Sequence, residues 1–184
     1  MRVFRFFALM ATLFGVTSTA AVASPRDLEN TLYMQLKDGR VVIELRPDLA
    51  PGHVARIKEL TRKGFYDGLN FHRVIDGFMA QTGDPRGDGA GGSDLPDLKA
   101  EFSTAKHVRG TASMARAGDP HSANSQFFIC FKPAPFLDGQ YTIWGQVVEG
   151  MEFVDAIKRG DEANNGAVDN PDKIISLKVA ADVK

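Results

Sequence analysis

An Asp-Gly pair between two short apolar stretches is the feature of this sequence that most constrains its fold. Asp76-Gly77 separates residues 71–75 (FHRVI) from residues 78–81 (FMAQ), and large apolar residues recur through both stretches. An Asp-Gly pair in that setting is a strong signal for a tight β-hairpin turn. The sequence therefore predicts an antiparallel hairpin within residues 71–84.

The side chains of a strand alternate between its two faces, and this alternation places an arginine among apolar residues. It groups Phe71, Arg73 and Ile75 on one face of the hairpin. His72 and Val74 fall on the other face. Either the alkyl stem of Arg73 covers an apolar edge while its head reaches water, or its charge has a function. The hairpin alone does not separate these alternatives.

Turn signals divide the rest of the chain into further short strands and two helices. Apolar residues recur at helical spacing after Pro51 and again over residues 151–158. Many short strands separated by Gly, Pro, Asn and Asp indicate an antiparallel sheet, closed into a barrel or folded as a sandwich. The other predicted strands are residues 30–36, 40–45, 110–115, 125–131, 141–148 and 173–179.

Residues 1–23 have the pattern of a cleaved secretory signal peptide. Arg2 and Arg5 precede an almost unbroken apolar run, and small residues then lead to Ala21-Val22-Ala23, an A-x-A cleavage site. The alternative is an uncleaved membrane anchor, but the apolar run is shorter than the roughly 20 residues that span a bilayer. We expect residues 24–184 to form one domain that is exported to the periplasm and has no stable membrane association after cleavage.

The composition and motifs argue against several common types of functional site. The net charge is −1, and it becomes −3 without Arg2 and Arg5, so no cationic surface for nucleic acid is predicted. The single cysteine, Cys130, lies in the apolar run 127–131, which indicates a buried and unreactive thiol. The four histidines lack zinc-binding spacing, and the G-x-G-x-x-G match at residues 87–92 is not followed by a helix. The sequence therefore predicts neither a metal nor a cofactor.

Five blocks follow one another between residues 71 and 151, within a resemblance to known proteins that covers roughly residues 30–179. They are FHRVIDGFMAQTGD, a Gly-rich loop, GTASMARAG, NSQFFICF and FLDGQYTIWGQVVEGM. In order and spacing they resemble the cyclophilin family of peptidyl-prolyl cis-trans isomerases, and in particular its bacterial periplasmic members. The resemblance implies a mainly β fold, a closed eight-stranded antiparallel β-barrel capped by two α-helices, with the site on the outer face of the barrel.

The resemblance also assigns the residues of the site. Arg73 matches the catalytic arginine of the family. Phe136 and Tyr141 stand where many eukaryotic members have Trp and His, and Arg116 stands where Asn is usual. Because the indole N–H donor of Trp is missing, we expect weak or no cyclosporin binding. The positions expected to bind substrate are Phe78, Met79, Gln81, Ala115, Arg116, Gln126, Phe128, Phe136, Leu137 and Tyr141.

The implied activity is rotation about X-Pro peptide bonds, which would assist the folding of exported proteins. The expected partners are proline-containing peptides and unfolded or folding proteins, and we expect the protein to be a monomer. An alternative is a proline-peptide binding module or holdase chaperone with little turnover, and a third is a barrel that carries a small ligand. Arg73 favours the isomerase, because binding alone would not require a charged group in this place.

Overall fold

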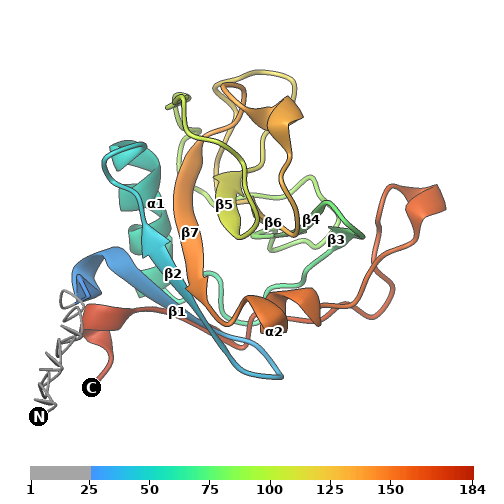
Figure 1. The fold of residues 1–184 in the computed structure, drawn as a ribbon, viewed down its shortest axis with the longest axis horizontal. Coiled ribbons are helices and arrows are strands. Elements are labelled where there is room, and N and C mark those ends of the chain that lie inside the picture. The colour runs from blue at the N-terminus through green and yellow to red at the C-terminus, as the bar shows by residue number, and fades with distance from the viewer. Residues whose placement is uncertain (1–25) are drawn as a thin grey trace, which may run out of the picture.

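The computed structural model describes residues 26–184, so the predicted signal peptide lies outside the described residues. Within them the chain forms eight β-strands, two α-helices and short turns of 3-10 helix (Figure 1). The helices are α1 (Pro51–Arg62) and α2 (Met151–Asp155). The strands are β1 (Thr31–Gln35), β2 (Arg40–Leu45), β3 (Arg73–Ile75), β4 (Met79–Thr82), β5 (Thr111–Met114), β6 (Phe127–Cys130), β7 (Ile143–Glu149) and β8 (Ser176–Val179).

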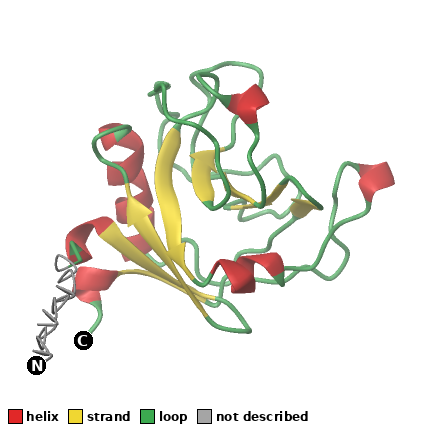
Figure 2. Ribbon diagram, in the orientation of Figure 1, coloured by secondary structure: helices red, strands yellow, loops and turns green. Residues whose placement is uncertain are grey.

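All eight strands belong to one antiparallel sheet, in the order β3-β4-β6-β5-β7-β2-β1-β8. The sheet curls into a half-barrel, and long loops connect its strands (Figure 2). The eight strands and the two helices agree with the predicted fold class, but the prediction of full closure is wrong. Within residues 26–184 the end strands β3 and β8 form no ladder with each other.

The sheet stays open because the chain between its two end strands is irregular. β3 has three residues and β8 has four, and most of the chain that faces across the opening lies outside both strands. Single backbone hydrogen bonds cross it instead, from Phe71 N to Asp172 O and from Ile174 N to Leu69 O, each 2.9 Å long. We call the two facing segments, residues 68–74 and 160–174, the seam.

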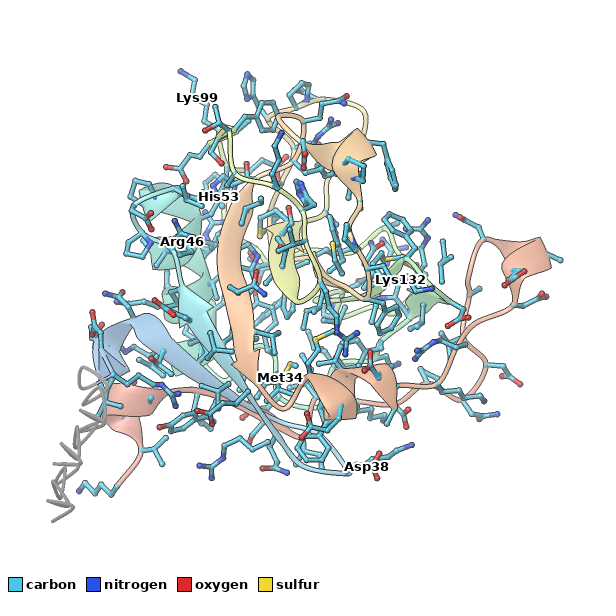
Figure 3. All side chains as sticks on the ribbon, in the orientation of Figure 1. Met34, Asp38, Arg46, His53, Lys99 and Lys132 are labelled. Atoms are coloured by element: carbon cyan, nitrogen blue, oxygen red, sulfur yellow. The ribbon has the colours of Figure 1, made fainter. Side chains whose placement is uncertain are left out.

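The main hydrophobic core lies inside the curled sheet. Figure 3 shows side chains filling this space, and the labelled Met34 of β1 lies there, fully buried. Trp144 is also fully buried, and its ring meets that of Phe127 edge to face at 5.2 Å. The predicted apolar face of α1 packs into the same core, through Val54, Ile57 and Leu60.

The hairpin predicted around Asp76-Gly77 is present, but one residue lies on a different face from that expected. Ile75 pairs with Met79 across the turn, where Gly77 has a φ of 67°. Phe71 does not share a face with Arg73, since it is fully buried in the main core together with Val74. The strict alternation of a strand begins only at Arg73, because the preceding residues bend into the seam.

A second, smaller apolar cluster lies on the outer face of the sheet. At its centre are Met79, Phe128, Cys130 and Leu137, and all four are buried. Their neighbours along the strands, such as Ala80, point to the main core instead, as the two-residue period of a strand requires. Burial raises the pKa of the Cys130 thiol to about 12, in keeping with the predicted unreactive cysteine.

Candidate active site

One row of side chains crosses four neighbouring strands on the outer face of the sheet. Arg73 of β3 pairs with Gln81 of β4, Gln81 with Phe128 of β6, and Phe128 with Ser113 of β5. Residues directly opposite each other in antiparallel strands present their side chains on the same face. The register of the sheet therefore places the cation and the amide of one hairpin beside an aromatic ring from a distant part of the sequence.

The guanidinium of Arg73 is held by three hydrogen bonds, each 3.0 Å long. Nη1 donates to Oε1 of Gln81, Nε donates to the backbone oxygen of Asn165, and Nη2 donates to Oδ1 of the same asparagine. All three acceptors are neutral, and no carboxylate in the described part of the chain pairs with this arginine. Burial lowers its pKa, yet an arginine in a protein stays charged. The side chain thus has a fixed place and an uncompensated positive charge.

Gln81 is in turn held by a chain of amide contacts. Its Nε2 donates to Oε1 of Gln126 at 2.9 Å. The Nε2 of Gln126 donates to the backbone oxygens of Gly89 and Gly91, at 3.0 and 2.8 Å. These contacts link the Gly-rich loop to Arg73 and leave Gln81 with little freedom to rotate.

A groove of about 900 Å³ runs over this row of side chains, a size suited to a small ligand or a short peptide segment. Its apolar end is formed by the outer cluster and by Phe136, whose ring is 63% exposed and lies 5.3 Å from that of Phe78. Gln126 lies outside this groove and lines a neighbouring hollow. The predicted site residues that line the groove are Arg73, Phe78, Met79, Gln81, Ala115, Arg116, Phe128, Phe136, Leu137 and Tyr141.

Arg116 forms the wall between the groove and the neighbouring hollow. Its guanidinium lies 4.5 Å from the centre of the Tyr141 ring, within the range of a cation–π contact. It also donates to the backbone oxygens of Gln140, at 3.1 Å, and Ala117, at 2.9 Å. The Tyr141 ring in turn meets that of Phe128 edge to face at 6.0 Å. Two of the three residues that depart from the eukaryotic pattern, Arg116 and Tyr141, thus pack together in one wall, and the third, Phe136, lies against Phe78.

The prediction from sequence missed one wall of the groove, which comes from the seam. Asn164, Asn165, Ala167 and Val168 line it, and Asn165 contacts Arg73 directly. The only signal in the sequence was the turn-forming stretch Asn164-Asn165-Gly166, which indicates a loop and gives no hint of its partner. Contact between the seam and β3 depends on how the sheet curls, so the local sequence could not reveal it.

A buried Ser-His-Asp arrangement beneath Phe128 was also missed. His107 Nδ1 lies 3.1 Å from Asp138 Oδ1, and His107 Nε2 lies 3.1 Å from the hydroxyl of Ser113. That hydroxyl is fully buried and donates to Thr142 O at 3.0 Å, so it does not face the groove as a nucleophile would. The imidazole stacks below the Phe128 ring at 6.3 Å, and this group supports the floor of the groove.

Residues 26–184 hold neither a metal-binding cluster of side chains nor a membrane-spanning helix. No cluster of three or more His, Cys, Asp or Glu side chains there could hold a metal ion. None of the helices in that range is long and apolar enough to cross a membrane.

A half-barrel with a fixed, uncompensated arginine beside an apolar pocket on its outer face is the architecture of a cyclophilin-type protein. The chain belongs to this family, since the family described as "Cyclophilin type peptidyl-prolyl cis-trans isomerase/CLD" matches residues 31–179. It is therefore a peptidyl-prolyl cis-trans isomerase of the cyclophilin type.

Curated relatives support this membership over nearly the full chain. A "Probable peptidyl-prolyl cis-trans isomerase" of Brucella suis is 57% identical over 188 residues, which cover 96% of this chain and 94% of the relative. "Peptidyl-prolyl cis-trans isomerase B" of Bacillus subtilis is 44% identical over 133 residues, which cover 71% of this chain and 92% of the relative.

Solved structures show the same fold. The cyclophilin AquaCyp293 from Hirschia baltica superposes with a TM-score of 0.76 at 29% identity, covering 86% of this chain and 76% of that one. A cyclophilin-type isomerase of Cryptosporidium parvum, crystallised in the presence of the dipeptide Ala-Pro, gives a TM-score of 0.74 at 28% identity. That comparison covers 81% of this chain and 98% of the other.

Proposed function

We propose that this isomerase rotates X-Pro bonds in exported proteins as they fold, with Arg73 as its catalytic residue. The proposal is supported above all by the hydrogen bonding of the Arg73 guanidinium. It is held by neutral acceptors beside the apolar end of the groove, so its charge and two of its N–H groups remain available to a substrate.

The chemistry of the prolyl bond explains why such a charge accelerates rotation. The cis and trans forms differ by only about 0.5–1 kcal/mol, but amide resonance sets a barrier of ~18–20 kcal/mol between them. In the twisted transition state that resonance is lost, and the proline nitrogen gains a lone pair that can accept a hydrogen bond. A donor fixed beside that nitrogen stabilises the twisted state more than either planar form, which lowers the barrier.

The apolar end of the groove supplies the binding part of the mechanism. Phe78, Met79, Phe128 and Leu137 offer a surface that a proline ring would bury, next to the Arg73 guanidinium. The Cryptosporidium parvum relative, studied with Ala-Pro, supports proline-containing peptides as the ligand class. Proteins that are unfolded or still folding expose such segments, and we expect them to be the natural substrates.

The pattern of residues 1–23 supports a place of action outside the cytoplasm. A basic start, an apolar run and the Ala21-Val22-Ala23 site are typical of a secretory signal peptide, and the periplasm fits this pattern best. N-terminal sequencing of the exported protein should then begin near Ser24. Recovery of protein that still begins with Met1 would contradict cleavage.

Refolding of a test protein separates the isomerase role from a holdase role. A substrate whose slow refolding phase is limited by an X-Pro bond takes tens of seconds or longer unaided. An isomerase should accelerate that phase at substoichiometric concentration, and the Arg73→Ala variant should not. A holdase would suppress aggregation stoichiometrically without changing the slow rate, and that result would overturn the proposed role in favour of the alternative.

A further inference from the structure

Asn165 holds one whole edge of the Arg73 guanidinium. Nε and Nη2 lie side by side on that edge, and both donate to this one residue, to its backbone oxygen and to its side-chain Oδ1. Gln81 holds Nη1 at the opposite end. Three of the five N–H groups of an arginine are thereby engaged, so two remain, one on Nη1 and one on Nη2. The acceptors thus leave the outer end of the guanidinium free.

The loop that carries Asn165 is fastened to β3 by backbone contacts across the seam. Val74 N donates to Gly166 O at 2.8 Å, and Gly160 N donates to Val74 O at 2.9 Å. The two glycines lie so close that a Cβ on Gly160 would come within 1.9 Å of Gly166 O. In Figure 1 this loop is the orange-red segment that follows α2 and extends past β3. It is therefore attached to the strand that carries Arg73.

Asn165 also has the backbone conformation that this contact requires. Its φ is 52°, in the left-handed region that asparagine adopts more readily than most residues. That conformation lets the backbone oxygen and the side-chain oxygen of one residue face the same guanidinium. Both oxygens are neutral, so they orient the cation without cancelling its charge, as a carboxylate in the same place would do.

We infer that Asn165 is a positioning residue for the isomerase reaction, which sets the direction in which Arg73 presents its free N–H groups to the groove. The inference rests on the proposed catalytic role of Arg73. An arginine side chain has several rotatable bonds, and Gln81 alone would hold only one of its three nitrogen atoms. A transition state is stabilised by donors that are already in place, so loss of the Asn165 side chain should affect turnover more than binding.

The test compares Asn165→Gly with Asn170→Gly in a protease-free isomerisation assay on a short X-Pro peptide. Glycine tolerates the left-handed backbone and keeps the backbone acceptor, so Asn165→Gly removes only the contact with Nη2. Asn170 is a matched control, because its φ is 50°, it does not line the groove, and it forms no hydrogen bond with Arg73. We expect kcat to fall about tenfold for Asn165→Gly with KM changed less than twofold, and Asn170→Gly to behave as the wild type.

A double mutant separates positioning from a general effect on the fold. In an Arg73→Ala background, Asn165→Gly should change the remaining rate less than twofold, since the residue acts through Arg73. An equal fractional loss in both backgrounds would overturn the inference, as would a normal kcat for Asn165→Gly alone. A normal rate for Arg73→Ala would contradict the proposed function itself, so the two failures are distinguishable.

Discussion

Arg73 and Gln81 lie directly opposite each other on β3 and β4, and the guanidinium donates a 3.0 Å hydrogen bond to the amide oxygen. This pairing follows from the turn at Asp76-Gly77, which sets the register of the hairpin. It makes Gln81 the partner of Arg73 on the side of the groove away from the seam. The role of this glutamine can be tested by removing its polar atoms while keeping its length.

A Gln81→Met variant should reduce kcat/KM about tenfold. A hydrogen bond to a charged group contributes about 1.5–3 kcal/mol, and water that replaces the lost acceptor would restore part of this free energy. Methionine is similar in size, so the space between Arg73 and Gln126 stays filled. Isomerisation of an X-Pro peptide, measured together with thermal unfolding, checks the prediction. An unchanged kcat/KM in a normally folded variant would show that Gln81 does not support Arg73.

Phe136 provides a prediction about ligand preference. Its ring is 63% exposed at the rim of the groove and touches Phe78, so a larger ring fits there without entering the core. A Phe136→Trp variant gains the indole N–H donor that the eukaryotic pattern has at this place. We expect cyclosporin to bind this variant about tenfold more tightly than the wild type, as one well-placed hydrogen bond would provide. Calorimetric titration of both proteins with cyclosporin checks the prediction. Equal affinities would show that the missing indole N–H does not limit binding.

The buried histidines predict how stability depends on pH. Burial lowers the pKa of His53, His72 and His107 in the folded protein. The unfolded chain has ordinary histidines that take up protons below about pH 6.5, and the folded protein resists this uptake. The free energy of unfolding should therefore be highest above that pH and fall as the pH drops toward 5. His53 lies on α1, which is on the opposite side of the view in Figure 1 from β3 and β4, so the effect is not confined to the site.

Urea denaturation at pH 7.5 and pH 5.5 measures this effect through the shift in midpoint. The ring nitrogens of His72 have no hydrogen-bond partner in the described part of the chain, so His72→Leu removes a titrating group without breaking a bond. This variant should show a smaller shift than the wild type. His121→Gln, a change on the exposed loop, should keep the full shift. Midpoints that stay constant between the two pH values would contradict the prediction.

Asp138 contributes in a different pH range. The backbone N–H of His107 holds the pKa of this carboxyl down to about 2. Its contribution to stability is present above the ordinary carboxyl pKa of about 4 and is lost as the pH falls through about 2. Asp138 therefore keeps its charge between pH 7.5 and pH 5.5, and the shift in urea midpoint between these two pH values reports on the histidines.

Local patterns in the sequence predicted most elements of the fold and most of the groove. The Asp76-Gly77 turn, the alternation in β4 and β6, and the apolar face of α1 each follow from neighbouring residues. The motifs around Arg73 and Phe128 placed the groove residues by resemblance, and the sheet register brings them together. Gln126 was the exception, since it lines the adjoining hollow.

The features that prediction missed depend on contacts between distant segments. The prediction of a closed barrel was wrong because the chain around Phe71 pairs irregularly with the chain around Asp172. The periodicity of apolar residues along a strand cannot show such pairing. The contact between Asn165 and Arg73 spans 92 residues and arises from that same irregular region. The support of Phe128 by His107 likewise joins segments whose separate motifs carry no sign of each other.

We propose that the guanidinium of Arg73, fixed by Gln81 and Asn165, stabilises the twisted prolyl bond through its charge together with its correctly placed N–H groups. Exchange of a short X-Pro peptide between cis and trans, measured by NMR for the wild type, Arg73→Ala and Arg73→Lys, tests it most directly. Lysine keeps the charge but cannot make the planar contacts of the guanidinium, so both variants should lose at least about 100-fold in kcat/KM while retaining the wild-type fold. A normally folded Arg73→Ala protein with nearly wild-type exchange would contradict the account.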